Sequence, residues 1–147
     1  MGYSQQVAAS FESSTSPLEL RIEAAEKVAR AGYPVGFILA PLYRFEGWQK
    51  QYVQLLERLA RRHALTNHPD LTFELIQHRF TSAAKAVILQ RDPKTKLEMD
   101  EAARKRQRGK YGHAKYVYRD EEAAELKNVL GAATARCFPQ ARIEYFT

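Results

Sequence analysis

Two short apolar runs, separated by one amphipathic helical pattern, constrain the fold of this chain more than any other feature. The first run, residues 33–41, is apolar almost throughout and has a proline near each end, which is typical of a strand buried on both faces. The second run covers residues 71–76, and between the two the apolar side chains of residues 48–59 recur at helical spacing. An earlier helix, which begins with a capping box, is predicted over residues 17–31. The order helix, strand, helix, strand predicts an α/β fold built from parallel βα units.

The last third of the sequence is organised differently. A short helix is expected over residues 81–90, followed by an irregular basic connection. Residues 104–119 are predicted to form a β-hairpin, because Gly109 and Gly112 can supply the positive-φ positions of a tight turn between two extended limbs. A helix that starts with three acidic residues and an alternating strand over residues 142–146 follow the hairpin.

Length and composition limit the class of protein. The 147 residues suffice for one ordinary domain. The single cysteine, Cys137, excludes an internal disulfide and a metal cage built only from thiolates of this chain. No apolar run is long enough to cross a bilayer, and the N-terminus lacks the features of a secretory signal. We therefore expect a cytoplasmic protein with no membrane partner.

The positive charge lies mainly in one segment. Residues 85–119 hold eleven Lys and Arg against four Asp and Glu, a local balance of +7, so the rest of the chain carries −1 of the formal net charge of +6. Within residues 104–119 there are seven basic residues, no acid and three tyrosines. Cations neutralise phosphates and aromatic faces stack on unpaired bases, so the segment suits nucleic acid. A solvated charged face with inward-facing tyrosines is the alternative from composition alone.

Candidates for catalytic chemistry are few. His78 follows directly on the second apolar run, where parallel α/β enzymes place ligand-contacting residues, but sequence alone favours a hydrogen-bonded histidine that fixes a loop. Glu74 lies within that run, and its role is open. Cys137 has no nearby partner in the sequence and suits a packing thiol better than a nucleophile. Three further histidines lack metal-ligand spacing: His63, His68 and His113. The sequence contains no phosphate-binding loop motif.

Several segments of the chain resemble, in order, the C-terminal part of the spore photoproduct lyase family. That family comprises radical S-adenosylmethionine (SAM) enzymes that reverse a thymine dimer in ultraviolet-irradiated spore DNA. The similarity extends from about Val7 to Thr147, and the runs ELIQHRFT and IEYFT make it specific. It is carried by residues 32–43, 46–48, 71–81, 93–100, 109–112, 115–118 and 143–147.

The resemblance implies the C-terminal portion of a partial (β/α)6 barrel. Residues 1–90 would hold its last βα units, and residues 91–147 the DNA-binding hairpin region with a helix and a short strand. By analogy, the backbone near Ala40 would contact the adenine of SAM. The family's CxxxCxxC motif and its hydrogen-donating cysteine lie upstream of the matching region, so we expect this chain alone to bind no [4Fe–4S] cluster and no cofactor. The missing N-terminal barrel half would be a partner, and its absence would expose apolar surface and favour self-association.

The resemblance also assigns the hairpin to lesion binding. Lys110 and Tyr111 match the family positions that hold the lesion, with lysine in place of the usual arginine, and would form a wedge that enters the gap left by an extruded base pair. The expected partner is double-stranded DNA with a thymine-dimer lesion. Two hypotheses stay open: a C-terminal part of a lyase, or a stand-alone DNA-binding module without chemistry. The expected phosphate contacts are Arg104, Lys105, Arg106, Arg108 and Lys115.

Overall fold

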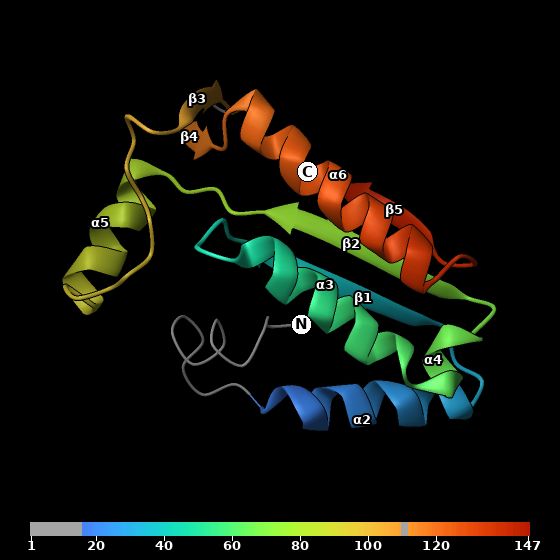
Figure 1. Ribbon diagram of the computed structural model, residues 1–147. Helices are drawn as coiled ribbons and strands as arrows, with labels where there is room; N and C mark the ends of the chain where they lie inside the picture. The colour runs from blue at the N-terminus through green and yellow to red at the C-terminus, as the bar shows by residue number, and fades with distance from the viewer. Residues whose placement is uncertain (1–15, 110–111) are drawn as a thin grey trace.

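The computed structural model describes residues 16–109 and 112–147. Its helices and strands follow the predicted order closely (Figure 1). In chain order they are α2 (Leu18–Arg30), β1 (Val35–Leu42), α3 (Trp48–Ala60), α4 (His63–Thr66), β2 (Leu71–Gln77), α5 (Ser82–Arg91), β3 (Lys105–Arg108), β4 (Ala114–Val117), α6 (Asp120–Cys137) and β5 (Arg142–Phe146). None of the described helices is long and apolar enough to span a membrane.

The main sheet is parallel throughout its described strands, in the order β1, β2, β5. Phe73 of the central strand pairs with Phe37 on one side and with Ile143 on the other. The parallel βα arrangement expected from the apolar runs is therefore confirmed. The last strand joins the same sheet, so the sequence beyond residue 90 contributes to one common core.

Helices α3 and α6 lie side by side over one face of this sheet (Figure 1). Alternate strand residues point toward them: the ring centroids of Phe37 and Phe73 are 5.4 Å apart, and Phe138 beyond α6 lies 5.2 Å from Phe73. The opposite face is open in the described part of the chain, where the Ile38 side chain is 47% exposed and Tyr145 is 49% exposed. The expectation that the first apolar run is buried on both faces is thus wrong for the described residues.

Helix α5 stands apart from this core (Figure 1). None of its residues is buried. Val87 is 46% exposed and Leu89 is 41% exposed. The helix begins where the Thr81 hydroxyl accepts a hydrogen bond from the Ala84 amide at 3.1 Å, a typical N-cap. Capping and local propensity define this helix, since core packing contributes little.

Candidate nucleic-acid interface

A two-stranded antiparallel hairpin projects beyond the carboxyl end of β2, as the sequence predicted (Figure 1). Lys105 pairs with Val117, and Arg108 pairs with Ala114. The turn requires its glycines: Gly112 has a φ of 79°, and a Cβ on Gly109 would lie 2.7 Å from the His113 carbonyl oxygen. The two residues between the glycines, for which lesion contact is expected, lie outside the described residues: Lys110 and Tyr111.

The exposed cations of the hairpin divide between its two faces. Arg106 and Arg108 share one face, where the small residues Gly112 and Ala114 leave a hollow of about 320 Å³ beside them. Lys105 lies on the other face, and its Nζ is 2.7 Å from the Asp120 carboxylate. A hydrogen bond from Tyr116 lowers the pKa of Glu101, and the Arg106 charge lowers it further, so one cation on each face lies near an acid.

Arg104 differs from these cations, because it is buried at the base of the hairpin. Its side chain is only 2% exposed. Its Nε and Nη2 donate to Glu98 Oε2 at 2.9 and 2.6 Å, and its Nη1 donates to the His78 carbonyl oxygen at 3.1 Å. The guanidinium carbon lies 3.7 Å from the centroid of the Tyr118 ring. The expected phosphate contact at Arg104 has no support in this geometry, because Glu98 and His78 already accept hydrogen bonds from its donors.

His78 occupies the carboxyl end of β2 and belongs to the same buried cluster. Its ring centroid lies 4.8 Å from that of Tyr43, and its Nδ1 lies 3.3 Å from Arg104 Nη2. Burial and, to a smaller extent, the neighbouring Arg104 charge together lower the pKa of His78 to about 4. The neutral ring accepts from Arg104, which favours the loop-fixing role over a proton-transfer role.

Further contacts attach the hairpin to the sheet. Phe80 and Tyr116 exchange two backbone hydrogen bonds, of 3.1 and 2.7 Å, and their rings stack with centroids 5.3 Å apart. The Tyr118 hydroxyl accepts from the Arg44 amide at 2.9 Å, and Arg44 Nη1 lies 2.5 Å from Glu122. These contacts tie β4 and the start of α6 to the loops that follow β1 and β2. The sequence contained no local signal for them.

The open sheet face carries the remaining candidate positions. Ala40 is partly exposed near the carboxyl end of β1, on the same side as Gly36 and Ile38. Glu74 also lies on this side and pairs across the sheet with Tyr145. Among the described residues no group of three His, Cys, Asp or Glu side chains is placed to hold a metal ion. Cys137, at the end of α6, packs against the core.

Comparison with known proteins identifies the origin of this arrangement. The family model described as spore photoproduct lyase matches residues 3–147. This chain belongs to the spore photoproduct lyase family. The spore photoproduct lyase of Geobacillus sp. (strain Y412MC61) is 54% identical over 137 residues, which are 93% of this chain and 40% of the relative. That of Bacillus subtilis (strain 168) is 53% identical over 137 residues, with the same coverage. The resemblance inferred from the motifs is confirmed.

Solved structures of spore photoproduct lyases match the fold closely. One is complexed with dinucleoside spore photoproduct, and another is a mutant with bound AdoMet and dinucleoside spore photoproduct. Each has a TM-score of 0.92 and 52% sequence identity, and the match covers 98% of this chain and 42% of that chain. The mixed α/β fold is therefore shared with the family, while this chain spans about 40% of the length of the curated relatives it matches.

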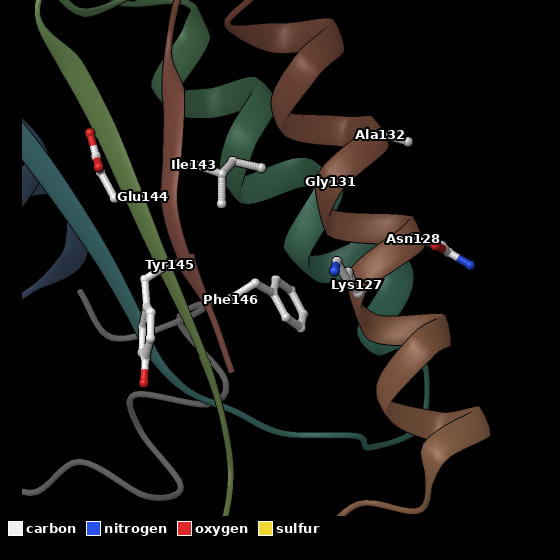
Figure 2. A pocket seen from close by; sticks show the side chains of 8 residues that line it. All are labelled: Lys127, Asn128, Gly131, Ala132, Ile143, Glu144, Tyr145 and Phe146. Carbon is white, nitrogen blue, oxygen red and sulfur yellow. The ribbon is translucent and has the colours of Figure 1, made fainter.

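A second hollow, of about 520 Å³, lies between α6 and β5 (Figure 2). Ile143 and Phe146 point toward α6, whereas Glu144 and Tyr145 point away from it (Figure 2). The Lys127 Nζ lies 6.0 Å from the centroid of the Phe146 ring. Sequence reasoning did not single out this groove, which appears only when β5 pairs beside β2.

Proposed function

We propose that this chain is the C-terminal segment of a spore photoproduct lyase-like radical SAM enzyme, which repairs the ultraviolet-induced thymine dimer called spore photoproduct in DNA. One observation carries the proposal. A hairpin with exposed arginines is rooted at the carboxyl edge of a parallel sheet, in a chain 52% identical to a lyase complexed with dinucleoside spore photoproduct. Ligands of open parallel sheets bind outside this edge.

The hairpin region, within residues 91–147, would contact double-stranded DNA. Lysine and arginine side chains neutralise phosphates, while the Lys110–Tyr111 tip enters the gap left by the lesion. Because Arg104 is buried, the proposed phosphate contacts are the exposed Arg106 and Arg108, assisted by two lysines, Lys105 and Lys115. Arg106 and Arg108 share one face and would approach the same strand of the duplex.

The sheet region, within residues 1–90, would supply the last two βα units of the partial (β/α)6 barrel. The open face then becomes the inside of that barrel, and the missing barrel half would extend the sheet from β1, an edge strand among those described. The backbone near Ala40, partly exposed at the carboxyl end of β1, fits the proposed contact with the adenine of SAM. When bound, SAM supplies the radical chemistry of the family.

The donors of this chain do not fit an iron–sulfur cluster. One thiol, Cys137, cannot replace the three cysteines of the family motif, and it packs against the core. We expect anaerobic iron–sulfur reconstitution of this chain to give no cluster absorbance and no SAM cleavage. Stoichiometric cluster uptake by the 147-residue chain would contradict this part of the proposal.

A chimaera tests the function directly. The upstream part of the Geobacillus relative is joined to residues 7–147 of this chain, reconstituted anaerobically, and supplied with SAM and duplex DNA that contains spore photoproduct. We expect the lesion to revert to two thymines, as measured by chromatography of the digested DNA. Tight lesion binding without repair would instead favour the alternative of a DNA-binding module without chemistry, and neither binding nor repair would refute the proposal.

A further inference from the structure

The hairpin meets the sheet through one buried cation. Arg104 is the residue directly before β3, and Tyr118 directly follows β4, so their contact of 3.7 Å joins both strands at the base of the hairpin. Glu98 comes from the connection that precedes the hairpin, and His78 comes from the end of β2. Arg104 thus links three segments that are distant in the sequence.

The charges in this cluster are balanced locally. A buried guanidinium is costly unless it is paired and its donors are satisfied. Glu98 receives two hydrogen bonds from Arg104 and is itself 48% exposed on its side chain. The His78 carbonyl oxygen accepts a hydrogen bond from Arg104 Nη1, and the His78 ring nitrogen accepts one from Arg104 Nη2. Removal of Glu98 would leave the Arg104 charge in a largely apolar site, between the rings of Phe80 and Tyr118.

We propose that Arg104 is a positioning residue, which together with Glu98 holds the hairpin in a fixed orientation against the carboxyl edge of the sheet. This inference rests on the proposed function, because the orientation matters through the exposed Arg106 and Arg108 and the tip that lies between the glycines. A phosphate bound at the hairpin and a ligand bound at the strand ends must keep a constant separation for the lesion to meet the reacting group. The Arg104–Glu98 pair sets that separation without touching DNA.

The two possible roles of Arg104 predict opposite effects for one substitution. If Arg104 contacted phosphate, Glu98→Gln would remove a competing acid and strengthen DNA binding. If Arg104 positions the hairpin, Glu98→Gln weakens the pair and lowers affinity for lesion-bearing duplex, by roughly tenfold, which corresponds to about 1.4 kcal/mol. Glu121→Gln is the matched control, because it removes the same charge from an exposed position at the start of α6.

The Arg104→Lys variant tests whether the planar shape of the guanidinium matters in addition to its positive charge. Lysine keeps the positive charge but lacks the planar fork that spans Glu98 and the His78 carbonyl. A positioning role predicts that Arg104→Lys weakens binding as much as Glu98→Gln does, with the salt dependence unchanged. Arg106→Gln, an exposed cation on β3, should instead lower the salt slope by about one unit. Equal behaviour of Arg104→Lys and the unaltered chain would overturn the inference.

Hydrogen exchange tests the same role without DNA. In the full 147-residue chain, Glu98→Gln should speed exchange of the Tyr116 amide, which bonds the Phe80 carbonyl at 2.7 Å, and leave the amides of β2 unchanged. Circular dichroism verifies that the variants are folded. Unchanged Tyr116 exchange, or stronger DNA binding by Glu98→Gln, refutes the positioning role. Absence of DNA binding by the chimaera refutes the proposed function instead, and the exchange comparison still decides the role of Arg104.

Discussion

The backbone amide of Arg44 donates a hydrogen bond of 2.9 Å to the hydroxyl of Tyr118, a residue 74 positions later in the chain. Arg44 follows β1, and Tyr118 connects the hairpin to α6. This bond joins the loop after one strand of the sheet to the element proposed to bind DNA. It also satisfies a partly buried amide that has no strand partner at this point.

Removal of the Tyr118 hydroxyl should therefore destabilise the chain. Tyr118→Phe keeps the ring against Arg104 but leaves the Arg44 amide without its acceptor, at a cost of about 1–2 kcal/mol. Urea unfolding followed by far-ultraviolet circular dichroism measures the change. Tyr145→Phe is the control, since Tyr145 is 49% exposed on the open face. Equal midpoints for Tyr118→Phe and the unaltered chain would show that the amide finds another partner.

The free energy of unfolding should depend on pH through the protonation of His78. Its folded-state pKa of about 4 lies below the ordinary 6.5, so the unfolded chain binds the proton first as the pH falls. The free energy of unfolding should thus decrease from pH 6.5 toward pH 5, and His78→Gln should remove most of that slope. Between pH 6.5 and pH 5 the upper limit of the effect is about 2 kcal/mol.

The window from pH 6.5 to pH 5 separates this effect from carboxylate titration. The pKa values of Glu26 and Glu101 are lowered by hydrogen bonds, from Arg30 and Tyr116 respectively, so these acids stay ionised there. Urea midpoints at four pH values, for the unaltered chain and for His78→Gln, make the comparison. Parallel curves for the two proteins would mean that His78 has the same pKa in the folded and unfolded chain.

The hairpin and the strands were predictable because their signals are local. Two glycines at the turn, and apolar runs bounded by prolines, specify φ angles and burial within a few residues. The burial of Arg104 was not predictable, because it depends on Glu98, His78 and Tyr118, which only the tertiary fold brings together. In the sequence, Arg104 is one of several neighbouring basic residues, and no local pattern indicates that its side chain faces inward.

The position of β5 shows the same limit. Its alternating pattern predicted a strand, but no local feature indicated that it would pair in parallel beside β2 rather than within the hairpin region. Similarly, the apolar run of β1 predicted two covered faces, while the described part of the chain covers one. In the proposed barrel, the second face of β1 would be covered by side chains that the described residues do not supply.

The open sheet face should drive self-association of the isolated chain. Ile38 is 47% exposed on β1, an edge strand among those described, and exposed apolar edges pair with one another. Ile38→Lys should shift the chain toward monomer in sedimentation velocity across a concentration series. Val87→Lys, on the separate helix α5 and 46% exposed, should leave association unchanged. Monomeric sedimentation of the unaltered chain at all concentrations would contradict this prediction.

Tyr111 should contribute to DNA binding only where a base is unstacked. The residue lies outside the described residues, and its proposed role rests on the family resemblance and on the glycines that flank the tip. An aromatic ring that stacks on an exposed base contributes about 1–3 kcal/mol, whereas a phosphate contact acts on every duplex.

In the chimaera, Tyr111→Ala should therefore weaken binding to lesion-bearing or mismatched duplex more than to intact duplex. Lys105→Ala should weaken both equally, because a phosphate contact does not depend on whether a base is unstacked. Fluorescence anisotropy titrations on the two duplexes at two salt concentrations give the comparison, and equal losses for Tyr111→Ala on both would reduce the tip to a generic basic turn.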